Sequence, residues 1–137
     1  NSAGTVKLRI SGERGRQIDL QFGEYFAPDG EPDTSNICFY PAGYSQRDVY
    51  ILKGEGEEIF EPVFTYHGFR YCVVLGITEQ EATADLLTFV VQNSALREIG
   101  SFVCSDGMTN KLQTMTRNSD LSNFYYFPTD CPHRCPA

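Results

Sequence analysis

The sequence lacks the features that usually indicate a nucleic-acid or membrane partner. Among its 137 residues, 11 are Lys or Arg and 18 are Asp or Glu, which gives a net charge of −7. Nucleic acids and anionic membrane surfaces bind proteins through clustered Lys and Arg. No apolar run approaches the roughly 18 residues that a membrane-spanning helix needs. We therefore expect no nucleic-acid partner and no membrane partner.

The chain also lacks tryptophan, internal repeats and low-complexity tracts, and strands do not alternate with helices as they do in parallel sheets. Apolar residues make up 41% and charged residues 21%, both within the range of ordinary globular proteins. This composition argues against disorder. Phe and Tyr together supply all of the aromatic content, which is 13%.

Strand-like segments fill most of the chain. Residues 5–10 (TVKLRI) alternate apolar and polar side chains, and the alternation resumes after a turn, with Ile18, Leu20 and Phe22 on one face. Segments rich in Val, Ile, Tyr and Phe follow, punctuated by glycine. The expected strands are 5–10, 16–26, 47–53, 58–65, 68–76, 84–94 and 99–105, while residues 37–46 stay ambiguous because Pro41 interrupts them.

A helix is expected after Cys104. Met108, Leu112, Met115 and Leu121 recur at roughly helical intervals, and Ser105 or Asp106 is a suitable N-cap. The order of elements predicts a mostly β fold, an antiparallel β-sandwich of the concanavalin or jelly-roll type. One C-terminal helix and an irregular, proline-rich tail follow the sandwich.

The tail (NFYYFPTDCPHRCPA) concentrates reactive side chains. Cys131, His133 and Cys135 are separated by single residues, which is too close for the usual tetrahedral zinc site. A Cys131–His133 nucleophilic pair would need a third orienting group and an oxyanion site, which so short a tail does not supply. We expect no metal and no cofactor. The other cysteines, Cys38, Cys72 and Cys104, lie in apolar settings and are expected to be free and buried rather than paired in a disulfide framework.

Two internal segments also carry charged or aromatic side chains. The loop 29–33 offers about three of the six to eight oxygens that calcium requires, so a solvated acidic turn is the favoured interpretation. Residues 54–71 (GEGEEIFEPVFTYHGFRY) contain acids that either face each other across a sugar or form a wet edge, the favoured alternative. His67 is expected to be a hydrogen-bonded residue at a strand end. The aromatic residues either pack in the core or form a platform for a sugar ring; they are Phe64, Tyr66, Phe69 and Tyr71.

Three blocks, ILKGEGEEIFEPVFTYHGFRY, IGSFVCSD and SNFYYFPTDCPHR, resemble the bacterial α-L-rhamnosidase family of glycoside hydrolases. They occur in the order and at the distances found in that family and span about residues 50–134. The segment 5–36, with QFGEYFAPDG, is similar to the strands just upstream in the family.

The resemblance implies a two-part organisation. Residues 5–104 would form the concanavalin-like β-sandwich domain, and 105–137 would form a linker helix and the truncated start of an (α/α)6 catalytic barrel. By the resemblance, Asp130 would contact the rhamnose and Arg134 would lie close by. Cys135 stands where the family has an acidic residue linked to catalysis. A thiol cannot replace a carboxylic acid at a glycosidic oxygen, so we expect no catalytic residue and no hydrolysis by this chain alone.

Two functions follow from this. The favoured hypothesis is a non-catalytic accessory sandwich that supports the catalytic domain of an α-L-rhamnosidase-like enzyme in plant rhamnoside degradation. The alternative is a stand-alone carbohydrate-binding module, with a rhamnose-containing glycan as partner. Such a module would hold sugar through Tyr66, His67 and Tyr71, or through Tyr25 and Tyr44. The aromatic run 124–127 is expected to fold back on the sandwich or to cause self-association.

Overall fold

The structure is a computed structural model that describes residues 2–33 and 46–131. Within these ranges the chain forms two facing antiparallel sheets and a single α-helix, as predicted. Most of the ambiguous segment 37–46, and also Cys38, Tyr44, Arg134 and the end of the proline-rich tail, lie outside the described residues.

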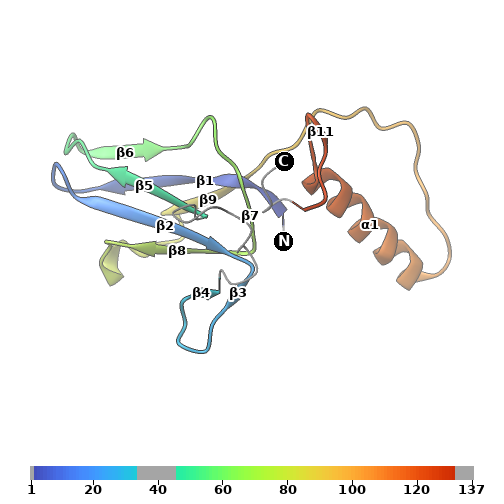
Figure 1. The fold of residues 1–137 in the computed structure, drawn as a ribbon, viewed down its shortest axis with the longest axis horizontal. Helices are drawn as coiled ribbons and strands as arrows, with labels where there is room; N and C mark the ends of the chain where they lie inside the picture. Colours follow the sequence, from blue (N-terminus) through green and yellow to red (C-terminus); the bar gives the residue numbers. More distant parts are fainter. Residues whose placement is uncertain (1, 34–45, 132–137) are drawn as a thin grey trace.

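Each sheet is built around one central strand (Figure 1). In the first sheet β1 (Ser2–Ser11) is central, and in the second sheet β2 (Gln17–Gly23) is central. The neighbours of β1 are β6 (Glu57–Phe60), β7 (His67–Phe69) and β9 (Leu87–Val91). The neighbours of β2 are β5 (Arg47–Ile51) and β8 (Tyr71–Leu75). Two short hairpins are formed by β3 (Tyr25–Phe26) with β4 (Pro32–Asp33) and by β10 (Phe124–Tyr125) with β11 (Phe127–Pro128), and η2 (Glu79–Glu81) is a 3-10 turn.

The core lies between β1 and β2, where the alternation places it. Leu8 of β1 and Ile18, Leu20 and Phe22 of β2 are completely buried. Each such side chain contributes about 1.5–3 kcal/mol when it leaves water. The alternation in the sequence therefore identified the inward faces of both central strands correctly.

The predicted strand 68–76 is in fact two strands that belong to different sheets. β7 pairs with β1, whereas β8 pairs with β2, and Arg70 lies between them. The Arg70 N–H donates to the Gly23 carbonyl at 3.0 Å, which fixes this corner of the sandwich. A continuous run of β-forming residues does not show where a strand changes sheets.

Two further expectations were wrong. The strand expected over 58–65 ends at Phe60, because Pro62 has no N–H to donate to a ladder. Phe64 is 99% exposed, which excludes the first of its two alternatives, a place in the core. Residues 99–105 form no strand, and Ile99 and Val103 are 87% and 85% exposed. Apolar and polar residues alternate in this segment, but no described strand pairs with it.

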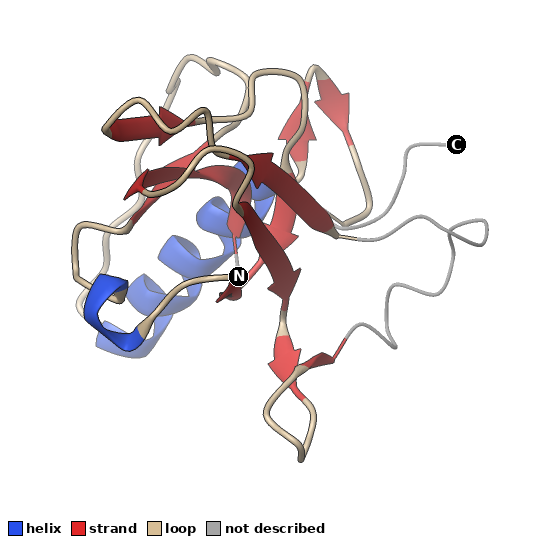
Figure 2. Cartoon of the chain, turned by 90° about the vertical axis from the view of Figure 1, so that its left-hand side faces the viewer, coloured by secondary structure: helices blue, strands red, loops and turns tan. Residues whose placement is uncertain are grey.

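The helix α1 (Gly107–Ser122) begins where the sequence predicts. Asp106 is its N-cap, and its carboxylate accepts hydrogen bonds from the N–H groups of Met108 and Thr109. Figure 1 shows α1 standing beside the sheets at the end of a long loop after β9, and in Figure 2 it lies behind the strands. No helix in the described ranges is long and apolar enough to span a membrane.

Candidate functional site

His67 is held inside the sandwich. Its side chain is 10% exposed and its ring stacks on Phe22, with 4.2 Å between the ring centroids. Nδ1 lies 3.1 Å from Oε1 of Gln46, and Nε2 lies 3.1 Å from Oδ1 of Asp48. This placement favours the interpretation of His67 as a hydrogen-bonded structural residue; its contact with a sugar stays a prediction.

Tyr66 and Tyr71 pack against different partners. The ring of Tyr66 stacks on Tyr125 at 4.4 Å between centroids, which joins the loop before β7 to the C-terminal hairpin. The ring of Tyr71 lies 4.4 Å from that of Phe26, and the Arg70 guanidinium lies 5.2 Å from the centroid of Tyr71. Both tyrosines are half-buried. Their expected role in sugar binding stays a prediction.

Asp130, the residue expected to contact rhamnose, is exposed at the end of the hairpin formed by β10 and β11. The hairpin is closed just before it, because the N–H of Thr129 donates to the Asn123 carbonyl at 2.7 Å and the Thr129 hydroxyl donates to the same oxygen at 3.1 Å. Its expected neighbour Arg134 lies outside the described residues. The structure therefore shows how Asp130 is presented, while the role of both residues stays a prediction.

Within the described ranges, Cys72 and Cys104 carry free thiols, and these two residues and Cys131 are only half-buried. Cys104 lies in the loop before α1, not in a strand, so its expected burial was wrong. Of the three residues considered for zinc, only Cys131 is described. Within residues 2–33 and 46–131, no group of three or more His, Cys, Asp or Glu could hold a metal ion.

Three acids of segment 55–61 contribute to the structure of the sandwich. Glu57 and Glu61 pair with Arg9 and Lys7 of β1, at 3.7 and 3.0 Å. Glu58 was expected at a wet edge, but it is buried. It is buried because β6 points alternate side chains inward, and position 58 is one of them.

The buried carboxylate of Glu58 is fully engaged. It accepts hydrogen bonds from the Tyr50 hydroxyl at 2.6 Å and from the N–H groups of Lys53 and Gly54 at 3.0 and 2.8 Å. The Tyr50 hydroxyl first, and then these backbone donors, lower the pKa of Glu58 to about 2. A carboxyl with so low a pKa stays ionised and cannot act as a general acid near neutral pH.

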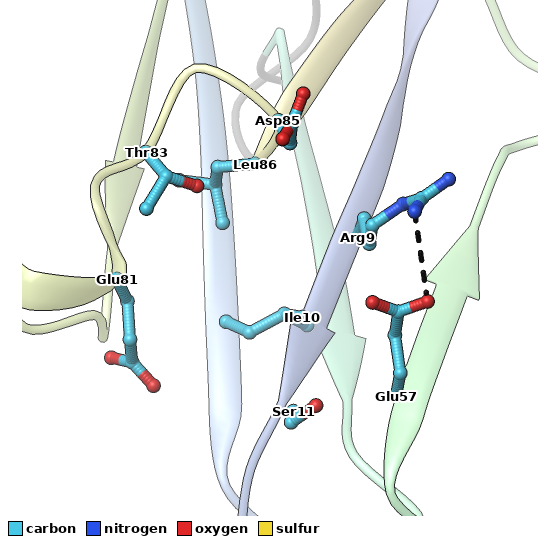
Figure 3. Close-up of a pocket in the computed structure, with 8 residues that line it drawn as sticks. All are labelled: Arg9, Ile10, Ser11, Glu57, Glu81, Thr83, Asp85 and Leu86. Carbon is cyan, nitrogen blue, oxygen red and sulfur yellow. Dashed lines mark ion pairs between the residues drawn. The ribbon is translucent and has the colours of Figure 1, made fainter.

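A pocket of about 360 Å³ opens beside β1 and β6 (Figure 3). Its lining residues are Arg9, Ile10, Ser11, Glu57, Glu81, Thr83, Asp85 and Leu86. The Arg9–Glu57 ion pair lies across one wall. Glu81 is held by Arg16 through two hydrogen bonds of 2.7 and 2.6 Å, which lower the pKa of this carboxyl to about 2. Among the described residues, the pocket is thus lined by arginine-bound carboxylates and by no aromatic ring.

Sequence reasoning missed Gln46, Asp48 and Ser94. Asp48 could have been found, because it shares the inward face of β5 with Tyr50, and a charged residue at a core-facing position needs a partner. Ser94, which contacts the C-terminal hairpin, lies outside every strand and carries no such signal.

The two antiparallel sheets packed around one core define the class of fold as a β-sandwich followed by a helix. Residues 1–92 match the family described as bacterial alpha-L-rhamnosidase concanavalin-like domain. Residues 97–135 match the bacterial alpha-L-rhamnosidase 6 hairpin glycosidase domain. The chain therefore belongs to the α-L-rhamnosidase family of glycoside hydrolases.

Individual relatives agree with the family match. The chain is 36% identical over 135 residues to an alpha-L-rhamnosidase of Formosa agariphila, covering 98% of this chain and 14% of that protein. It is 38% identical over 134 residues to an alpha-L-rhamnosidase of Streptomyces avermitilis, covering 98% of this chain and 12% of that one. The chain therefore spans about one seventh of the length of these relatives.

Solved structures share the fold. The alpha-L-rhamnosidase of Streptomyces avermitilis complexed with L-rhamnose superposes with a TM-score of 0.84 at 36% identity, over 98% of this chain and 12% of that one. The native enzyme from Aspergillus terreus gives a TM-score of 0.84 at 33% identity, and the match covers 98% of this chain and 15% of that one. The sandwich and its concanavalin-like type are thus confirmed. The predicted domain boundary between residues 104 and 105 stays a prediction.

Proposed function

We propose that this chain is the accessory β-sandwich and connecting helix of an α-L-rhamnosidase, that it has no catalytic group of its own, and that it supports the enzyme's glycosidase domain. The observation that carries the proposal is the exposed apolar surface along α1 and the loop before it. No residue of α1 is buried. Met108, Leu112 and Met115 are 74%, 62% and 67% exposed.

These three side chains form one stripe on the helix. At 100° per residue, positions 108, 112 and 115 lie within about 60° of one another around the helix axis. The opposite side of α1 and the loop residues 100–103 together line a hollow of about 490 Å³. The helix contributes mainly polar side chains to it; its lining residues are Asn110, Gln113, Thr114, Arg117, Asn118 and the apolar Leu121. An apolar stripe that faces solvent is typical of a surface that contacts another domain, and Ile99 and Val103 of the preceding loop are exposed as well.

The occupant we propose is the 6 hairpin glycosidase domain, because the sequence match to that domain begins at residue 97 and includes this surface. The substrate would be a rhamnoside, with Asp130 and Arg134 at its rhamnose unit. The acids we described are engaged within the sandwich. The family resemblance implies hydrolysis with inversion, which instead needs two facing carboxyl groups about 6.5–9.5 Å apart.

Two assays test this function. The 137-residue chain should show no turnover of an aryl α-L-rhamnoside, and measurable turnover would overturn the proposal. Residues 2–131 should also replace the matching segment of the Streptomyces avermitilis enzyme with activity retained. In that chimera, Met115→Glu should lower the thermal stability, because it places a charge in the domain contact. Gln113→Glu, on the opposite side of α1, is the matched control.

A second function, sugar binding by surface aromatics, is favoured by one observation. Tyr25 and Phe26 are 60% and 47% exposed, and Phe26 packs against Tyr71 at the same corner. Exposed aromatic rings offer the flat apolar faces on which sugar rings stack. Calorimetric titration of the chain with rhamnose and plant oligosaccharides tests this function. Heat that is lost in Phe26→Ala would support it, and absence of heat would exclude it.

A further inference from the structure

We infer that Tyr66 and Ser94 of the sandwich are positioning residues for Asp130, because they hold the hairpin that carries it. The inference rests on the proposed function, in which Asp130 contacts the rhamnose. It goes further in giving the sandwich a direct part in substrate recognition. The contacts that support it either join the sandwich to the hairpin or close the hairpin just before Asp130.

The first contact is the ring stack between Tyr66 and Tyr125. The ring centroids are 4.4 Å apart and the ring planes are inclined by 26°. Tyr66 directly precedes β7, whose first residue His67 pairs with Gly4 of β1. The Tyr66 backbone is therefore fixed by the first sheet, and its ring holds one strand of the hairpin.

The second contact is a pair of hydrogen bonds made by Ser94. Its N–H donates to the Phe124 carbonyl at 2.9 Å, and its Oγ accepts from the Tyr126 N–H at 2.6 Å. Two residues earlier, the Gln92 N–H donates to the Ala3 carbonyl at 3.1 Å. Ser94 is thus anchored to β1 and binds both the start and the turn of the hairpin.

The turn of this hairpin is strained, and the strain shows that the contacts determine its conformation. Tyr126 has a φ of +69°, the only positive φ among the described non-glycine residues. Left-handed backbone is unfavourable for a residue with a Cβ and persists where surrounding contacts enforce it. The Tyr126 ring is 89% exposed, so its own packing does not supply the constraint. The hydrogen bond from its N–H to Ser94 supplies the constraint, together with the pairing of Tyr125 with Phe127 on either side of it.

The constraint extends to Asp130 through the backbone. Thr129 closes the hairpin by donating twice to the Asn123 carbonyl, and Asp130 is the next residue. Between the sandwich and Asp130 there are therefore a ring stack, two hydrogen bonds and one closed turn. A displacement of about 1 Å at a substrate-contacting group can reduce the rate about 100-fold. Because Asp130 is proposed to bind the rhamnose and not to take part in bond cleavage, we expect the loss of either anchor to appear mainly as a rise in KM, of about tenfold.

The kinetic test uses a chimera in which residues 2–131 replace the matching segment of the Streptomyces avermitilis enzyme. The variants are Ser94→Ala and Tyr66→Leu, with Ser101→Ala and Val63→Ala as controls at exposed positions in the neighbouring loops. We expect the variants to raise KM for an aryl α-L-rhamnoside about tenfold with less effect on kcat, and the controls to match the parent. Ser94→Thr keeps the hydroxyl and should restore KM.

Asp130→Asn separates positioning from general stability. If Ser94 acts through Asp130, Ser94→Ala should add little to the loss caused by Asp130→Asn. Additive losses, unchanged KM in the single variants, or losses that follow the thermal stability alone would overturn the inference. An inactive parent chimera would instead contradict the proposed function.

A second measurement does not depend on activity. In the 137-residue chain, the N–H of Thr129 is hydrogen-bonded to the Asn123 carbonyl, so a loosened hairpin should exchange this amide proton faster. Hydrogen–deuterium exchange followed by mass spectrometry should show faster exchange of the Thr129 amide in Ser94→Ala and Tyr66→Leu than in the parent and the two controls. Equal rates in all five proteins would show that these residues do not hold the hairpin.

Discussion

The Nε2 of His67 on β7 lies 3.1 Å from Oδ1 of Asp48 on β5, so this pair joins the two sheets of the sandwich. The two side chains are 10% and 11% exposed. Gln46 supplies a hydrogen-bond partner for the other nitrogen of the imidazole, and Phe22 stacks on its ring. Nε2 of His67 and the second oxygen of Asp48 are both buried without a hydrogen bond, and unsatisfied polar groups in a core are costly.

Removing the histidine should destabilise the fold. His67→Leu leaves the Asp48 carboxylate buried without its neighbour, so we expect a loss of about 3 kcal/mol in the free energy of unfolding. Urea denaturation followed by circular dichroism measures it. The double variant His67→Leu with Asp48→Leu should recover part of the loss, because no buried charge remains. A single variant as stable as the parent would show that the pair contributes little.

Glu58 should make stability depend on pH in the acidic range. Its pKa is lowered from 4.5 to about 2, chiefly by the Tyr50 hydroxyl, so the unfolded chain takes up a proton at higher pH than the folded chain does. The stabilisation is complete above pH 4.5 and is lost as the pH falls toward 2. Urea denaturation between pH 6 and pH 3 measures the free energy of unfolding. This free energy should be lower in Glu58→Gln than in the parent at pH 6 and should decline less as the pH falls. Exposed Glu55→Gln is the control and should follow the parent.

Cys72 should resist thiol reagents in the folded chain. Burial first, and then the Asp48 carboxylate, raise the pKa of its thiol from 9.0 to about 12, so the reactive thiolate is scarce at pH 8. Because the folded pKa is the higher one, the stability due to this group is intact below pH 9 and declines as the pH rises toward 12. Mass spectrometry after labelling at pH 8, with and without urea, should show modification of Cys72 only in urea. Rapid labelling in buffer would contradict this.

The isolated chain should self-associate through its exposed apolar side chains. Tyr126 and Phe127 are 89% and 49% exposed on the hairpin, in addition to the methionine stripe of α1. We expect the average molar mass from light scattering to rise with protein concentration. It should rise less in the double variant Tyr126→Ser, Phe127→Ser. Gln113→Glu should behave as the parent. A strictly monomeric chain at all concentrations would argue against the prediction.

The local pattern predicted most of the fold. Alternation identified the inward faces of β1 and β2, and Asp106 was one of the two N-caps proposed for α1. The quoted blocks identified the family, because long, unusual strings of residues rarely recur by chance. These features depend on neighbours in the chain, and a sequence displays such neighbours directly.

Only the tertiary structure decided which segments meet. Alternation shows which side of a strand faces inward, but it does not name the partner strand, so it could not separate β7 from β8 at Arg70 or show that 99–105 has no partner. The same holds for the candidate site. The contacts of His67 with Asp48 and of Ser94 with Tyr126 join residues 19 and 32 positions apart. Their geometry exists only once the sheets have closed on the core and brought those backbones together.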